Sequence, residues 1–272
     1  MPVSGSGVGP ILCAVDGSTH AQAVAYTAAG LALQLETSVT LVRADERAAG
    51  SEAAQLQAHA ELETLVKQSM TRPAGNRILV APRVVAGHPG DVIRQAIEST
   101  HPSMVVMGSR GRRLLSRSLL GSTGLALLRD TAVPLVLVPP SDPEVMSVVS
   151  AGSRPHVGGI LIPVDLNGPA DAQLRLAGLF ARGGNPRVTL LHATREADRG
   201  HAETMLNGLK SRIPFSESVD VVVVTGDATS AVTNLISEFE FGVVVLGRDR
   251  HHAGALASEI LHNSNALVAI AP

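Results

Sequence analysis

Three glycines and a serine stand at a spacing that could bind a phosphate. In the segment MGSRGRRLLSRSLLGST, Gly108, Gly111, Gly121 and Ser122 fit the pattern G-x2-G-x9-G-[ST]. Glycine lets backbone N–H groups approach phosphate oxygens without a Cβ in the way, and it permits positive φ. Gly121, Ser122 and Thr123 also begin the helical segment GSTGLALLRD, whose free N–H groups favour an anion. The alternative is that these glycines only shape a strand-to-helix turn.

The chain repeats itself, and the repeat shows which elements position this loop. Residues 11–16 (ILCAVD) recur as residues 160–165 (ILIPVD), and residues 39–44 (VTLVRA) recur as residues 188–193 (VTLLHA). Further on, the strand that ends at Gly108 corresponds to one that ends at Gly247. Pro, Gly and Ser gather between the copies. We therefore expect two domains, residues 1–150 and 151–272.

Each copy alternates short apolar runs with Ala- and Leu-rich stretches of helical period, such as residues 21–35 and 55–70. This alternation predicts βαβ units and an α/β fold with a parallel sheet buried on both faces, with five strands and four helices per copy. In such sheets ligands bind beyond the carboxyl ends of the strands, where the strand order reverses. The glycine loop follows the fourth strand and is therefore expected at that edge.

Composition narrows the function classes. The 272 residues are 45% hydrophobic and 17% charged, which is typical of globular domains with an aliphatic core. A net charge of -2 provides no general attraction to nucleic acid or to an anionic membrane, although four arginines cluster between residues 110 and 117. The sequence contains no membrane-length apolar run, and its start does not resemble a secretory signal. We expect a cytoplasmic protein in which Cys13 is a buried small hydrophobe.

Taken together, three features resemble the universal stress protein family: the glycine spacing, the VDGS at residues 15–18, and the Val-Pro before the last strand of the first copy. The chain looks like a tandem member with two such domains. The resemblance implies Rossmann-like five-stranded domains of the adenine nucleotide alpha hydrolase type, packed as a pseudo-dimer. It also implies that the first domain binds ATP, accompanied by Mg²⁺.

The resemblance assigns adenosine-binding roles to several positions. Ala14, Val15 and Asp16 match the end of the family's first strand, where the backbone meets adenine and the aspartate approaches the ribose hydroxyls. A carboxylate suits that role because it accepts two hydroxyl protons. Ala44 matches a position whose backbone recognises the adenine edge, and Met107 matches a residue that lines the pocket. Asp16 could instead be only a turn acceptor after a strand.

The phosphate-binding positions of the family fall on the glycine loop, at Gly108, Gly111, Gly121, Ser122 and Thr123. Arg110, Arg112 and Arg113 could add positive charge beside a triphosphate, or they could simply be solvated arginines of a surface loop. Arg43 replaces the histidine that is common before the adenine-contacting position. Because recognition there is through the backbone, this difference does not argue against binding.

The second copy departs from the nucleotide pattern, and we expect it to bind no ATP. Arg250 stands where the second glycine should be, Gly254-Ala255 is the nearest remnant of G-[ST], and the loop is about seven residues shorter. Pro163 also replaces Ala14. His251, His252 and His262 lack the further spaced ligands of a metal site, so surface histidines are the better interpretation.

These observations favour a regulatory or stress-response protein that binds ATP in its first domain. The chain has no G-x4-G-K-[ST] motif and no lysine near the phosphate glycines, so rapid phosphoryl transfer is not expected. Two alternatives stay open: an interaction or structural protein in which neither site is occupied, and an enzyme with slow ATP hydrolysis or phosphotransfer. We expect residues 134–139 and 266–271 to be edge strands that pair within the chain, and a further homodimer is possible.

Overall fold

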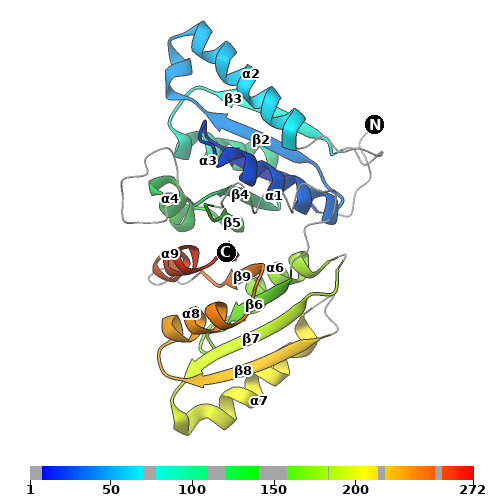
Figure 1. The fold of residues 1–272 in the computed structure, drawn as a ribbon, viewed down its shortest axis with the longest axis vertical. Coiled ribbons are helices and arrows are strands. Elements are labelled where there is room, and N and C mark those ends of the chain that lie inside the picture. The colour runs from blue at the N-terminus through cyan, green and yellow to red at the C-terminus, as the bar shows by residue number, and fades with distance from the viewer. Residues whose placement is uncertain are drawn as a thin grey trace. The chain divides into compact units, whose positions relative to one another are not determined.

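The computed structural model describes residues 8–69, 78–109, 121–140, 158–182, 184–213, 218–248 and 253–272. The chain divides into two compact units, which Figure 1 draws as ribbons. The boundary predicted at residue 150 falls outside the described residues, as do Arg110, Gly111, Arg112, Arg113, Arg117, Arg250, His251 and His252.

The first unit alternates strands and helices along the chain. Its elements are β1 (Ile11–Val15), α1 (Ala21–Gln34), β2 (Val39–Ala44), the short 3-10 helix η1 (Glu46–Ala49), α2 (Glu52–Ser69), β3 (Val80–Val85), α3 (Pro89–Thr100), β4 (Met104–Gly108), α4 (Ser122–Asp130) and β5 (Leu135–Val138). Helices α1 and α2 pack against each other, as do α3 and α4, and α1 and α3 both contact β1 (Figure 1). The sheet is thus covered by helices, as a parallel sheet requires.

The strand order in this unit is β3-β2-β1-β4-β5, and every pair is parallel. The order therefore reverses beside β1, which has β2 on one side and β4 on the other. The register places Ala14 beside Met107 of β4 and Val42 of β2. All five residues of β1 are buried, and Cys13 is fully buried as expected.

The second unit repeats this architecture. Its elements are β6 (Gly159–Pro163), α6 (Asp171–Ala181), β7 (Arg187–Thr194), η2 (Glu196–Asp198), α7 (Arg199–Leu209), η3 (Lys210–Arg212), β8 (Val219–Thr225), α8 (Ala228–Glu238), β9 (Val243–Leu246), α9 (Ala253–Asn263) and β10 (Leu267–Ile270). The order β8-β7-β6-β9-β10 is that of the first unit, and the pairs β6·β7, β6·β9, β7·β8 and β9·β10 are parallel. The α/β class with two parallel-sheet units in tandem is confirmed.

Both units make the same unusual turn between their third strand and third helix. Gly87 has a φ of 139° and Gly226 has a φ of 132°, a conformation that side chains with a Cβ rarely adopt. A Cβ on Gly87 would lie 3.3 Å from Cγ2 of Val92, whereas a Cβ on Gly226 would meet no atom within 4 Å. Within the described ranges, no helix combines the length and the apolar character needed to cross a bilayer.

Candidate functional site

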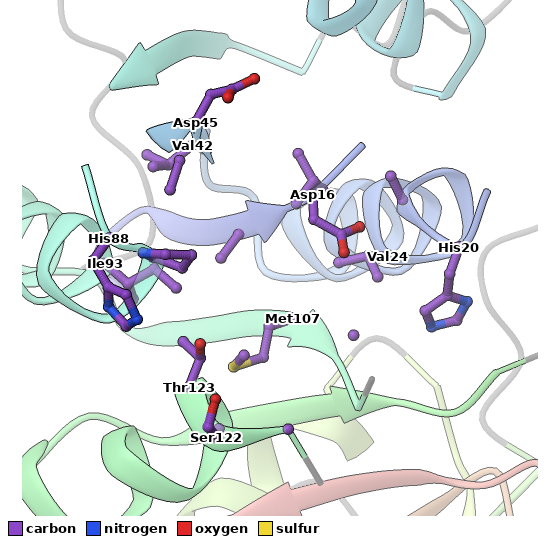
Figure 2. Close-up of a pocket in the computed structure, with 18 of the residues that line it drawn as sticks. Asp16, His20, Val24, Val42, Asp45, His88, Ile93, Met107, Ser122 and Thr123 are labelled. Atoms are coloured by element: carbon purple, nitrogen blue, oxygen red, sulfur yellow. The ribbon is translucent and has the colours of Figure 1, made fainter. Parts of the chain in front are cut away.

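A cavity of about 980 Å³ opens at the carboxyl ends of β1, β2 and β4 in the first unit (Figure 2). Its volume lies at the upper end of the range for small-molecule sites. Of the ten residues predicted to bind nucleotide, nine line this cavity: Ala14, Val15, Asp16, Ala44, Met107, Gly108, Gly121, Ser122 and Thr123. The tenth, Gly111, lies outside the described residues. The structure brings the predicted residues together, and their role in binding stays a prediction.

The carboxylate of Asp16 lines this cavity, and its two oxygens differ in their hydrogen bonding. Oδ1 accepts hydrogen bonds from the backbone N–H of Ser18 at 3.0 Å and from the Ser18 hydroxyl. Oδ2 is buried and has no hydrogen-bond partner among the described residues. A buried acceptor without a partner is costly unless a ligand supplies a donor. The Ser18 bonds form the turn predicted as the alternative role, yet they leave Oδ2 available.

The start of α4 forms another part of the cavity wall. Gly121 is the N-cap residue of α4, and Ser122 and Thr123 form its first turn. Figure 2 shows their hydroxyl groups on the opposite side of Met107 from Asp16. No acidic side chain occupies this first turn, so the positive end of the helix dipole is not neutralised there.

The two described glycines of the motif, Gly108 and Gly121, do not use the positive φ that glycine permits. Gly121 has φ -65° and ψ 158°, and Gly108 is not among the positive-φ glycines. Other residues tolerate these angles, so what glycine adds at Gly121 is the absence of a Cβ beside the cavity. The N–H of Gly121 donates to the carbonyl of Ser109 at 3.0 Å. The free N–H groups of α4 therefore begin after Gly121.

Ser109 was not among the predicted residues, although it follows Gly108 directly. It lines the cavity, is 1% exposed, and its hydroxyl oxygen has no partner among the described residues. Two residues that line the cavity, Asp16 and Ser109, thus each have a buried oxygen atom that no described residue satisfies. A hydroxyl-rich ligand or an ordered water molecule would satisfy both.

Two histidines that the sequence analysis missed also line the cavity. His20 is the N-cap residue of α1, and its Nε2 lies 3.1 Å from the carbonyl oxygen of Val138. Burial lowers the pKa of His20, while the Val138 bond and the charge of Asp16 oppose that shift. His88 is the N-cap residue of α3, and its Nδ1 accepts from the N–H of Gly90 at 3.3 Å. His88 and Pro89 together form a helix-start signal that could have placed this histidine at the same edge of the sheet.

Buried charges support the rim of the cavity beside β2. Arg43 is 4% exposed, and its guanidinium contacts Glu61 of α2 at 2.5 Å and Asp45 at 3.5 Å. Asp45 also accepts from the backbone N–H of Arg47 at 3.0 Å, which starts η1. Burial raises the pKa of Asp45, but the bonds from Arg47 and the charges of Arg47 and Arg43 outweigh it, so the pKa is lowered overall. Arg43 is thus a structural residue that holds Asp45 and Arg47 at the rim.

The corresponding positions of the second unit are arranged differently. Asp165 is exposed, and its Oδ1 accepts from the N–H and the side-chain amide of Asn167. His192 occupies the position of Arg43, and its Nδ1 lies 2.8 Å from the carbonyl oxygen of Val164. His262 is exposed in the last turn of α9. Among the described residues of the whole chain, His, Cys, Asp and Glu form no group of three that could hold a metal.

Residues 7–139 match the Universal stress protein family, so the first unit contains a domain of that family. Two solved structures are similar over almost the whole chain. A universal stress protein from Archaeoglobus fulgidus is 17% identical with a TM-score of 0.67, covering 96% of this chain and 97% of that chain. A putative universal stress protein from Pseudomonas aeruginosa is 16% identical with a TM-score of 0.60, covering 97% and 93%.

A similar fold also occurs in a solved structure that is not described as a universal stress protein. The cytoplasmic domain of a prokaryotic cation chloride cotransporter is 12% identical with a TM-score of 0.60, covering 97% of this chain and 95% of that chain. No curated protein matches the sequence. At these identities the solved structures establish the fold, and the function has to be argued from the site.

Proposed function

We propose that this chain is an ATP-binding regulatory protein of the universal stress protein family, in which residues 1–150 hold the nucleotide and residues 151–272 do not. The observation that carries the proposal is Oδ2 of Asp16, a buried carboxylate oxygen at the wall of the first-unit cavity that has no partner in the described part of the chain. A ribose hydroxyl would donate to it, and charged acceptors make the stronger hydrogen bonds.

The rest of the cavity fits the other parts of an adenine nucleotide. Val24, Val42, Ile93 and Met107 supply apolar surface for a base. Ser122 and Thr123, at the start of α4, supply hydroxyl donors and free backbone N–H groups for phosphates. Mg²⁺ would accompany the triphosphate and neutralise part of its charge. The proposal keeps the cytoplasmic location predicted from the sequence.

A regulatory role is favoured over rapid catalysis by the residues that surround the cavity. Among its described lining residues there is no lysine, and the carboxylate of Asp45 is bonded to Arg47 and Arg43. A fast phosphoryl-transfer enzyme needs a positioned cation at the phosphates and a base at the nucleophile. We therefore propose that the bound nucleotide changes what the protein contacts, with hydrolysis slow or absent.

Calorimetric titration with Mg-ATP tests this proposal on wild type and Gly121→Val. Valine tolerates the backbone angles of Gly121, so the variant is expected to fold, but its side chain would extend beside the cavity. We expect wild type to bind one ATP per chain and Gly121→Val to bind at least tenfold more weakly. Gly254→Val, at the start of α9 in the second unit, is the matched control and should bind like wild type.

Mass spectrometry of gently purified protein provides an independent measurement. Co-purifying ATP at one molecule per chain would support the proposal. If wild type shows neither co-purifying nucleotide nor a calorimetric signal with Mg-ATP, the first unit is not an ATP site. Equal affinity of Gly121→Val and wild type would show that ATP binds elsewhere.

A further inference from the structure

In the second unit, a side chain forms hydrogen bonds to two neighbouring strands at the position that corresponds to the cavity of the first unit. Gln173 of α6 stands eight residues after Asp165, as Val24 of α1 stands eight residues after Asp16. Val24 lines the cavity of the first unit and is labelled in Figure 2. The side chain of Gln173 instead reaches between β6 and β9, where its Nε2 donates to the carbonyl oxygens of Pro163 and Val245, each at 2.7 Å. Gln173 is 4% exposed.

The hydrogen bonds of Gln173 are explained by the way β6 pairs with β9. In the first unit, the register of β1 and β4 continues to Ala14 beside Met107. In the second unit, the described register of β6 and β9 covers Ile160 beside Val243 and Leu161 beside Val244. The residue at the position of Ala14 is Pro163, which has no N–H to donate to a ladder. Gln173 supplies a donor to Val245 where the proline cannot.

The carboxamide of Gln173 also lies beside Gly247, the glycine that the second copy retains at the position of Gly108. A Cβ on Gly247 would lie 3.4 Å from Oε1 of Gln173 and 3.7 Å from its Cδ. The glutamine side chain therefore lies against one side of Gly247, which is itself exposed. A Cβ at this position would be in ordinary van der Waals contact with the carboxamide, so Gln173 does not require a glycine here.

We propose that Pro163 and Gln173 act as a matched pair that closes the ligand crevice of the second unit, with the glutamine carboxamide replacing the strand pairing that the proline prevents. This inference deepens the proposed function, because it names the residues that restrict nucleotide to the first unit. It adds a cause independent of the shortened loop and of Arg250. The crevice is occupied by the protein's own polar group, which competes with any ligand for that position.

A double-mutant cycle on the full chain, without nucleotide, tests the pairing. Thermal unfolding is followed for wild type, Q173V, P163A and P163A/Q173V. We expect Q173V to lower the unfolding midpoint by a few degrees, because the buried carbonyl of Val245 and the partly buried carbonyl of Pro163 lose their donor. In the P163A background the same change should lower the midpoint by less than half as much, because the introduced N–H can restore the ladder. Equal shifts in both backgrounds would overturn the pairing.

Selective ¹⁵N-glutamine labelling tests closure directly. The Gln173 carboxamide signals, assigned by their loss in Q173V, should exchange slowly with solvent and stay unchanged when Mg-ATP saturates the first unit. Rapid exchange, or a shift of those signals with ATP, would show that the crevice is open. If wild type binds no ATP while the carboxamide is protected and the cycle shows coupling, the proposed function fails and this inference stands.

Discussion

The imidazole Nε2 of His20 lies 3.1 Å from the carbonyl oxygen of Val138, and the backbone N–H of Ser109 donates to the same oxygen at 3.0 Å. One carbonyl oxygen can accept both bonds through its two lone pairs. The oxygen therefore joins the start of α1, the end of β4 and the end of β5. His20 and Ser109 both line the cavity, so its wall depends on this junction.

The junction predicts a loss of stability in mild acid. Burial, the largest influence, lowers the pKa of His20 below its ordinary value, so the unfolded chain binds the proton more readily than the folded chain. Stability from His20 is complete above the unfolded pKa of about 6.5 and falls as the pH drops towards the lower folded pKa. Urea unfolding at pH 7.5 and 5.5 should show a smaller difference for His20→Gln than for wild type. His201→Gln, at an exposed position of α7, should keep the wild-type difference.

Asp16 and Asp165 provide a matched pair of variants. Asp16→Asn should weaken Mg-ATP binding about 10- to 100-fold, the loss expected when a charged acceptor is removed from a hydrogen bond. Asp165→Asn should leave binding unchanged, because Asp165 is exposed and bonded to Asn167 in the other unit. Calorimetry on both variants decides the matter. Equal effects of the two substitutions would argue against a specific role for Asp16.

The buried charges around Arg43 predict a large effect on folding. Arg43→Met removes one partner of Asp45, which is 5% exposed and keeps its bonds from Arg47, and one partner of the half-exposed Glu61. A buried carboxylate that loses a cationic hydrogen-bond donor is destabilised, so the free energy of unfolding should fall by about 1.5–3 kcal/mol. Arg187→Met breaks the surface pair with Asp220 and should change it by less than about 1 kcal/mol. Urea unfolding curves for both variants measure these changes in the free energy of unfolding. Similar changes for the two variants would contradict a structural role for Arg43.

Cys13 predicts a simple chemical behaviour. It is the chain's one cysteine, it is fully buried in β1, and burial raises the pKa of its thiol. Since the thiolate is the reactive form, a thiol reagent should label no cysteine in native protein and one per chain in denaturant. Rapid labelling under native conditions would show that β1 opens to solvent, which its central position in the sheet argues against.

Much of the fold was predictable because strands and helices have periods that a single sequence displays. Residues 39–44 form β2 as expected, and the helix expected at residues 55–70 is α2, which begins three residues earlier. Repetition made the prediction firmer, since both copies show the same alternation. The close grouping of Asp16, Met107 and Ser122 was also anticipated, because strand ends of a parallel sheet meet at one edge.

The contacts that escaped prediction depend on side chains from elements distant in the sequence. Val138 and His20 are far apart in the sequence and come together only on folding, so no local sequence pattern predicts their hydrogen bond. Gln173 carries no sequence signal of its role, because it lies on a helix, away from the glycine loop where the second copy departs most visibly from the first. Pro163 differs from Ala14 in the sequence, but its effect on strand pairing becomes visible only in the register of β6 and β9.

The turn at Gly87 and at Gly226 is a backbone feature that the two units share although their side chains differ. The second unit keeps at Gly226 a left-handed backbone angle close to that of Gly87 in the first unit. Duplication of one ancestral module would leave this trace, since the path of the chain must survive for either copy to fold. Within that shared path the side chains differ between the two units, as Val24 and Gln173 illustrate.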